Sequence, residues 1–239
     1  MRRVVLFSLV VLLVLVTAMP VAAQPRADKD QIKLRVFIHY PKPGKPGPKP
    51  GTCDPSASNT PDTYVLTGWK HSGTVTYHVN YASIPSTVSN AQTAISNSFE
   101  VWDALAQGVD LVEGATTTLT GYKLDGVNLV AWGRTPRGAI AVTYTWAYSW
   151  GEVVEQDIIM GASLPWSYTQ AKDPDTTCGD LYSYDVQNIL THEVGHIFGL
   201  DDLYNSEDQD LTMYGYGDRG ELKKDTLGTG DTDGMRALY

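Results

Sequence analysis

Apolar and polar residues alternate in two stretches of the chain, residues 74–80 and 139–146. Side chains two residues apart lie on the same face of a β-strand, so each stretch is predicted to be a strand with one buried face. Residues 128–132 and 153–160 are also predicted strands, and the second is more buried at its end. The residues on the alternating apolar faces are Val75, Tyr77, Val79, Ile140, Val142, Tyr144 and Trp146.

Apolar positions spaced three and four residues apart predict helices on both sides of these strands. The first helix covers residues 90–105, the second runs from about residue 183 to 198, and a short one, residues 230–239, closes the chain. Strands clustered in the first part, with helices at both ends, indicate an α+β fold. The apolar faces of the first two helices are Ile95, Phe99, Trp102, Leu105, Val186, Ile189, Leu190, Val194, Ile197 and Phe198.

The N-terminus has the pattern of a secretory signal peptide. Arg2 and Arg3 precede an apolar run over residues 4–16, and small residues follow at positions 21–23. We therefore predict that residues 1–23 are removed on secretion. A transmembrane anchor is the alternative, but the apolar run is short for a bilayer span.

Residues 24–59 are predicted to be an N-terminal segment rather than part of the compact domain. Residues 24–40 are of mixed composition and carry no predicted element. Residues 41–51 contain only proline, lysine and glycine, which predicts an extended linker, and the lysines make it a candidate cleavage site. The 239-residue chain is long enough for one sizeable core, which we expect to span residues 60–239.

The net charge indicates which partners the protein can bind, and the cysteines indicate how its chain can be cross-linked. The formal net charge is −9, so a nucleic-acid partner is not expected, and we expect a soluble monomer with no membrane contact after signal cleavage. The two cysteines, Cys53 and Cys178, favour one disulfide in an exported protein. The alternative is that Cys53 lies upstream of the domain as a thiolate that caps a metal.

The candidate chemistry lies near the end of the second helix. His192 and His196 are four residues apart, so their imidazoles lie on the same side of the helix and can bind one zinc ion. Glu193 is turned slightly aside, where it can reach a metal-bound water without binding the metal itself. Two histidines and a glutamate at this spacing are specific for zinc hydrolases, although the motif alone does not prove one.

The residues after this motif supply a third ligand. Gly199 is expected to end the helix in the left-handed conformation and turn the chain back toward the metal. Asp202 then falls at the ligand position and is favoured over its neighbour Asp201, because adjacent side chains of an extended segment point apart. A carboxylate oxygen is a known third zinc ligand. Glu221, farther along the chain, is the alternative third ligand.

The other three histidines are interpreted as ordinary residues. His78 lies on the polar face of a predicted strand, and His39 and His71 lie in polar, loop-like sequence.

The sequence "HEVGHIFGLDD", residues 192–202, resembles the metzincin signature His-Glu-x-x-His-x-x-Gly-x-x-His/Asp. "LTMYGYG", residues 211–217, resembles the Met-turn of these zinc proteases, with Met213 beneath the ligands. Among metzincins the chain is most similar to matrixins, through "AISNSFEVWDAL", "DVQNILTHEVGHIFGL", "TMYGY" and "LGTGDTDGMRALY". It departs from them at Asp202, where matrixins carry histidine and snapalysin-type metzincins carry aspartate. The matrixin zymogen motif Pro-Arg-Cys-Gly is also absent, and "GTCDP" around Cys53 is a poor match to it.

The resemblance implies a metzincin-like single domain, with a twisted mixed sheet, a zinc-binding helix and a small C-terminal subdomain. It also implies that residues 140–145 bind the substrate as an added strand, and that residues 214–217 wall the pocket for the residue after the cut. Structural calcium is implied too, with residues 205–210 and Asp157 as candidate ligands. Neither Tyr214 nor Tyr216 stands at the spacing of a zinc-binding tyrosine.

The predicted function is therefore that of a secreted zinc endopeptidase acting on proteins or peptides. Zinc held by His192, His196 and Asp202 would bind a water and lower its pKa toward about 7. Glu193 would accept the water's proton as general base and pass it to the leaving amine. The alternative is a non-catalytic exported metal-binding or interaction domain of the same fold, against which the presence of Glu193 argues.

Overall fold

The computed structural model describes residues 31–43, 60–170 and 178–239. The predicted signal peptide, most of the linker and Cys53 lie outside these residues, so the signal peptide and the pairing of Cys53 with Cys178 stay predictions. Within the described part of the chain, no helix is long and apolar enough to cross a membrane.

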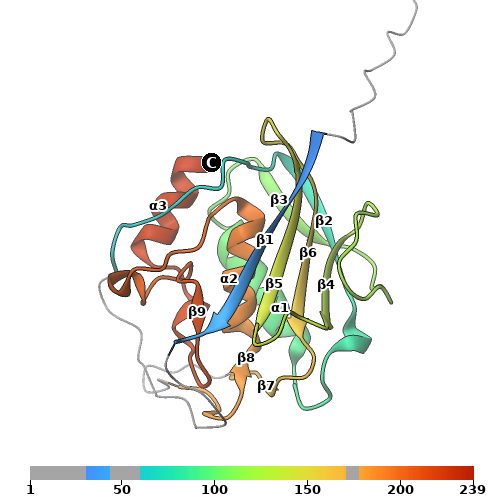
Figure 1. Ribbon diagram of the computed structural model, residues 1–239, viewed down its shortest axis with the longest axis vertical. Helices are drawn as coiled ribbons and strands as arrows, with labels where there is room; N and C mark the ends of the chain where they lie inside the picture. The colour runs from blue at the N-terminus through green and yellow to red at the C-terminus, as the bar shows by residue number, and fades with distance from the viewer. Residues whose placement is uncertain (1–30, 44–59, 171–177) are drawn as a thin grey trace, which may run out of the picture.

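A mixed sheet of seven strands forms the centre of the described structure, in the order β3-β2-β4-β6-β5-β1-β9 (Figure 1). Strands β3, β2, β4 and β6 are parallel to one another, whereas β5 is antiparallel to both β6 and β1. The short β9 is parallel to β1 at the sheet edge. The bounds are β1 (Ile32–Pro41), β2 (Gly73–Val79), β3 (Val109–Glu113), β4 (Asn128–Gly133), β5 (Ala141–Tyr148), β6 (Val153–Gly161) and β9 (Tyr216–Gly217). Two further strands, β7 (Trp166–Ser167) and β8 (Tyr184–Asp185), pair only with each other.

Two helices, α1 (Ala91–Asp103) and α2 (Val186–Phe198), lie side by side against one face of the sheet (Figure 1). The Trp102 indole of α1 is fully buried and donates a hydrogen bond of 2.7 Å to the Thr191 carbonyl of α2, which fixes the two helices together. The C-terminal α3 (Thr229–Leu238) packs beyond the end of α2. Single turns of 3-10 helix occur at Tyr81–Ser83, Ser206–Asp208 and Lys223–Asp225.

The α+β fold as a single domain is confirmed, together with all four predicted strands and all three helices. Helix α2 begins at Val186, not near residue 183, because the Asp185 carboxylate accepts the Asn188 N–H and caps the helix. It ends as predicted at Gly199, whose φ of 107° is in the left-handed region.

Strand β1 is the main difference from the sequence analysis, which predicts no element before residue 60. Residues 32–41 instead extend the sheet beyond β5. Apolar residues alternate with lysine and arginine in "IKLRVFIH", but these apolar positions are exposed or only partly buried, and half of the strand's residues are exposed. Only Phe37 and His39 are buried, and both lie at the candidate site described next.

Candidate metal centre

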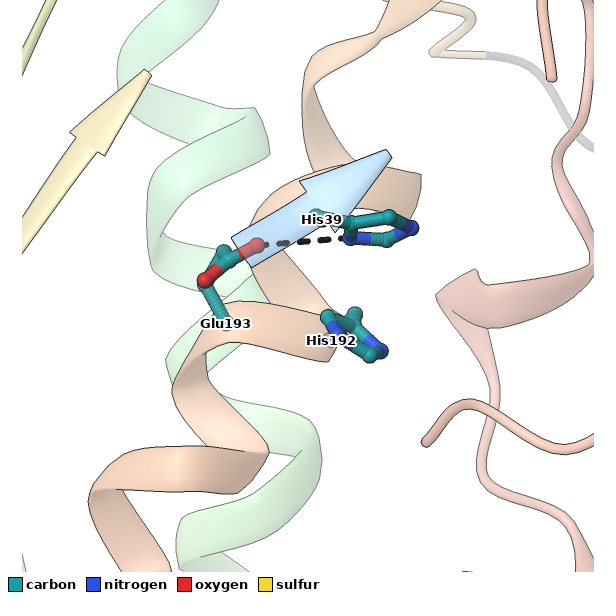
Figure 2. A group of neighbouring side chains, drawn as sticks. All are labelled: His39, His192 and Glu193. Carbon is teal, nitrogen blue, oxygen red and sulfur yellow. Dashed lines mark ion pairs between the residues drawn. The ribbon is translucent and has the colours of Figure 1, made fainter. Parts of the chain in front are cut away.

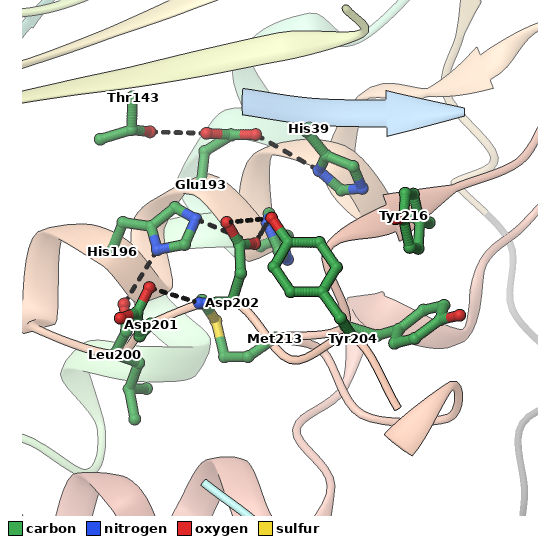
Figure 3. A network of polar contacts seen from close by, with 12 residues as sticks. His39, Thr143, Glu193, His196, Leu200, Asp201, Asp202, Tyr204, Met213 and Tyr216 are labelled. Carbon is green, nitrogen blue, oxygen red and sulfur yellow. Dashed lines mark hydrogen bonds and ion pairs between the residues drawn. The ribbon is translucent and has the colours of Figure 1, made fainter. Parts of the chain in front are cut away.

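Helix α2 presents His192 and His196 to one point, where their ring nitrogens lie close together. Figure 3 shows His196 beside Asp202 at this point. Both side chains are buried, and each ring is held through its Nδ1 atom. His192 Nδ1 lies 2.8 Å from the Thr212 carbonyl, and His196 Nδ1 lies 2.9 Å from the Leu200 carbonyl. A carbonyl accepts only from N–H, so each Nδ1 carries the proton and each Nε2 keeps its lone pair. The two Nε2 atoms are therefore prepared to bind a metal ion.

Asp202 completes the group. After Gly199 the chain turns back, and Asp202 Oδ1 lies 3.2 Å from His192 Nε2 and 3.6 Å from His196 Nε2. The other carboxylate oxygen accepts a 3.1 Å hydrogen bond from the Tyr204 hydroxyl, a contact that the sequence analysis missed. Gly215 permits this arrangement, because a Cβ there would lie 2.5 Å from the Tyr204 ring and 3.0 Å from Asp202 Oδ1.

The neighbouring Asp201 points elsewhere. Its carboxylate forms an ion pair with Arg35 of β1 and accepts the Asp202 N–H at 2.9 Å. Adjacent side chains thus diverge after Gly199, as predicted. Glu221, the alternative ligand, is also buried away from the group, where it accepts the Asp218 N–H at 2.8 Å.

The donor set fits zinc. His192 Nε2, His196 Nε2 and Asp202 Oδ1 are buried and have no hydrogen-bond partner among the described residues, and the three ligand atoms lie within 4.8 Å of one another. Burial, followed by the nearby Lys224 ammonium, lowers the pKa of His192 to about 4, so its imidazole is neutral. Burial acts to raise the pKa of Asp202, but its neighbours, which include the Tyr204 hydroxyl that donates to it, lower it to about 2, so its carboxylate is ionised. Two neutral imidazoles and one carboxylate form a zinc site that leaves a fourth position open.

Glu193 lies beside this group and is fully buried. Its Oε2 accepts a 2.6 Å hydrogen bond from the Thr143 hydroxyl of β5, and its Oε1 lies 3.3 Å from His39 Nδ1 (Figure 2). Burial raises the pKa of Glu193 to about 8, despite the Thr143 hydrogen bond. A carboxylate with a raised pKa is suited to accept and return a proton near neutral pH.

Met213 packs beneath the ligands, as the sequence analysis expects. A Cβ atom on Gly195, between the two histidines, would lie 2.2 Å from the Met213 sulfur. The Met213 backbone is held by α3, because Asp231 accepts the N–H groups of Thr212 at 2.8 Å and Met213 at 3.0 Å. Asp231 also accepts the Gly228 N–H at its own helix N-terminus. The sequence gives no signal for its longer-range role.

Comparison with known protein families shows to which family the chain that carries this site belongs. Residues 68–239 match the family described as Matrixin. The chain belongs to the matrixin family. It is thus a matrixin-family metalloendopeptidase, and matrixins are zinc-dependent. No curated protein matches the chain.

Strand β1 lies outside the matrixin match, yet it contacts the metal centre directly. The His39 ring lies 4.0 Å from the His192 ring, and its Nε2 is 3.1 Å from the Lys224 ammonium. His39, His192 and Glu193 form a second group of potential metal ligands (Figure 2). We interpret that group as a contact between β1 and the site, because both ring nitrogens of His39 already face protein groups.

The interpretation of His39 as an ordinary loop residue is therefore wrong. It lies in a strand, is 1% exposed and touches the matrixin zinc helix. Period-two alternation over residues 32–39, which places Phe37 and His39 on one face, is the signal that could have revealed it. His71 and His78 belong to neither group of potential metal ligands among the described residues.

Calcium stays a prediction for this matrixin. The Asp157 carboxylate accepts the backbone N–H groups of Lys123 at 2.9 Å and Leu129 at 3.0 Å, so protein donors occupy it. Neither Asp157 nor the acidic loop at residues 205–210 belongs to a group of potential metal ligands in the described part of the chain.

Proposed function

We propose that this matrixin is a secreted zinc endopeptidase in which His192, His196 and Asp202 hold the zinc ion and Glu193 is the general base. The observation that carries this proposal is the convergence of three buried, unpartnered ligand atoms beside a buried glutamate. Secretion rests on the signal-peptide pattern of residues 1–23.

Zinc bound by these residues would act as a Lewis acid toward the attacking water and the peptide carbonyl. Thr143 donates to Glu193 Oε2 and so fixes the carboxylate, which leaves Oε1 as the oxygen that accepts the proton of the water. The same oxygen then returns this proton to the nitrogen of the leaving amine. Tyr204 orients the Asp202 carboxylate, as the backbone carbonyls orient the two imidazoles.

The substrate of this proposed reaction is a protein or peptide in an extended conformation. The edge of β5 borders the zinc helix, and the segment at residues 214–217 faces it from the other side. A strand placed between them can pair its backbone with both edges, which is the common mode of peptide recognition at a sheet edge.

Replacement of the general base tests the proposal. We expect Glu193→Ala to retain one zinc ion per chain, because Glu193 is not a ligand, but to lower the rate of casein or gelatin hydrolysis by about 10²–10⁴-fold, the usual contribution of general-base catalysis. Glu152→Ala, which removes an exposed carboxylate, is the matched control. Equal hydrolysis by the wild type and Glu193→Ala would refute the endopeptidase and favour a non-catalytic metal-binding domain.

A further inference from the structure

Strand β1 occupies the place where the proposed function requires a substrate. Eight of its residues pair antiparallel with β5, from Ile32 opposite Tyr148 to His39 opposite Ala141. The next two residues pair in parallel with β9, Tyr40 with Tyr216 and Pro41 with Gly217. A segment of the chain's own N-terminal region is thus held as a strand between the two edges (Figure 1).

Main-chain hydrogen bonds hold β1 on both sides of the site. The Ile140 N–H donates to the His39 carbonyl at 2.7 Å, and the Lys42 N–H donates to the Gly217 carbonyl at 3.0 Å. These bonds do not depend on side-chain identity, and they are the kind that an incoming peptide would form. The edges of β5 and β9 cannot serve a second strand while β1 is bound there.

The two buried side chains of β1 cover the metal ligands. The Phe37 ring stacks on the His196 ring, with centroids 4.0 Å apart and planes inclined by 14°. The His39 ring lies 4.0 Å from the His192 ring with the two planes tilted by 53°, and its Nδ1 approaches Glu193 Oε1 to 3.3 Å (Figure 2). Thr143 donates to Oε2, and His39 stands beside Oε1, so β1 covers the proposed general base on the side that Thr143 leaves open.

A third set of contacts anchors the strand beside the ligand Asp202. Arg35 forms an ion pair with Asp201, and its guanidinium lies 4.8 Å from the centroid of the Phe37 ring and 5.5 Å from that of Trp69. Arginine stacked on aromatic rings and paired with a carboxylate is well held for a partly exposed side chain.

We propose that residues 32–41 are a built-in inhibitor, seated in the substrate cleft with Phe37 and His39 over the zinc ligands, and that this strand keeps the enzyme latent until it is displaced. This inference rests on the proposed function. It requires no cysteine in the strand and differs in this respect from latency by a metal-bound thiolate, because residues 32–41 contain none.

Peptide binding tests the proposal without relying on activity. The probe is a fluorescein-labelled synthetic peptide of residues 31–43, and the proteins are full-length chains loaded with zinc and carrying Glu193→Ala to prevent cleavage. We expect a double substitution, Phe37→Ser with His39→Ser, to release the strand and bind the peptide at least tenfold more tightly than the chain with native β1. Leu34→Ser with Val36→Ser is the matched control, since both side chains are exposed on the same strand, and it should bind as weakly as native β1.

Hydrolysis by the same variants with Glu193 intact separates the two proposals. Faster cleavage of a quenched peptide by Phe37→Ser/His39→Ser supports both. Tighter peptide binding without hydrolysis would support residues 32–41 as an inhibitor of peptide binding but would overturn the proposed endopeptidase function. Equal peptide affinity for native β1 and the double variant, or binding to neither, would overturn the built-in inhibitor even if both chains were active.

A separate observation concerns the pocket that receives the His39 side chain. Its walls include Gly217, where a Cβ would lie 3.0 Å from His39 Nε2 and from Ile189 and 3.2 Å from Ile140. At its end lies the fully buried Lys224, whose ammonium donates to the carbonyls of Tyr214 and of Tyr216, the latter at 3.0 Å. The pocket therefore has apolar walls and, at its end, the fixed ammonium group of Lys224 as a hydrogen-bond donor.

The geometry points to Lys224 as a specificity-determining residue, which favours substrates with a hydrogen-bond acceptor, as in glutamate, glutamine or neutral histidine, directly after the cleaved bond. The inference rests on the proposed function and on the pocket lining, so it stands whether or not β1 inhibits. A buried donor left without an acceptor disfavours an apolar side chain at this position.

A pair of peptides measures this preference. Two quenched peptides that differ only by glutamine or leucine after the cleaved bond are compared in the Phe37→Ser/His39→Ser background. We expect a glutamine-to-leucine ratio of kcat/KM above about 10, and a ratio below 1 in Lys224→Met.

The ratio is independent of the folded fraction, so a destabilised variant still gives a result. Lys123→Met, which removes an exposed lysine that is not in this pocket, is the control. An unchanged ratio in Lys224→Met would overturn the assignment, whereas no cleavage of either peptide by any variant would count against the endopeptidase.

Discussion

At the scale of single residues, small groups at close approach decide the geometry of the metal centre. Gly195 lies between His192 and His196 on α2, in contact with Met213 and Trp102. A side chain at this position would push the zinc helix away from the turn that carries Met213. The absence of a Cβ is thus as important to the site as the ligands themselves.

Gly195→Ala should therefore destabilise the protein, even though alanine is the better helix former. Its Cβ would lie 2.2 Å from the Met213 sulfur and 2.9 Å from the Trp102 ring, so we expect a loss of at least about 2 kcal/mol in the free energy of unfolding, as for other overpacked cores. Urea denaturation of the zinc-free chain measures it. In a Met213→Ala background the cost should be smaller, and an equal cost in both backgrounds would show that the sulfur is not the obstacle.

Much of the candidate site follows from residue spacing alone. Four-residue spacing places His192 and His196 together, and a left-handed Gly199 returns the chain so that Asp202 meets them. Tyr204, Thr143 and His39 could not be placed in this way. Each reaches the site across a turn or from another element, and no local periodicity encodes such a contact.

At the scale of elements, α3 supports the metal centre from outside it. The buried Asp231 accepts backbone N–H groups from Thr212, Met213 and Gly228, and so joins the helix start to the turn beneath the ligands. The C-terminal helix is thus part of the framework that fixes the position of Met213.

Asp231→Ala leaves these buried N–H groups without a partner, and we expect it to lower the free energy of unfolding by about 2–3 kcal/mol. Asp233→Ala is the matched control on the same helix, because Asp233 pairs only with the exposed Arg236 in the described structure. Its effect should stay within about 0.5 kcal/mol. Equal destabilisation by the two substitutions, measured by urea denaturation, would contradict the role of Asp231.

The strands and helices whose apolar face is the buried face could be predicted, whereas β1 and β3 were missed. In β1 the apolar residues do alternate, but half of its residues are exposed, and the two buried ones, Phe37 and His39, lie on the face that also carries Lys33 and Arg35. Strand β3 is an edge strand, with a single buried residue, Val109. An edge strand is defined by the neighbour with which it pairs, and pairing over distances such as that between residues 32 and 148 is not encoded locally.

At the scale of the whole molecule, the metal centre connects elements from distant parts of the chain. The ligands come from α2 and the following turn, the support from the Met213 turn and α3, and the cover from β1 (Figure 3). Zinc at this junction is expected to stabilise the entire fold, since it binds the folded chain and not the unfolded one.

Removal of zinc by a chelator should therefore abolish hydrolysis and lower the melting temperature. With free zinc at a thousand times its Kd, the expected contribution to the free energy of unfolding is about 4 kcal/mol. Calorimetry before chelation, after chelation and after addition of zinc measures it. Zinc should restore the melting temperature, and magnesium should not, because imidazole ligands favour zinc. An unchanged melting temperature after complete removal of zinc would contradict the structural part of this account.

The central claim is that an aspartate completes the zinc site, and the zinc content of two adjacent variants tests it most directly. Asp202→Ala removes the proposed ligand, whereas Asp201→Ala removes a neighbouring carboxylate that pairs with Arg35. After dialysis against a weak chelator, we expect one zinc ion per chain in the wild type and in Asp201→Ala, and less than about 0.1 in Asp202→Ala, because loss of one of three ligands weakens the site severely. One tightly bound zinc ion in Asp202→Ala would contradict the claim.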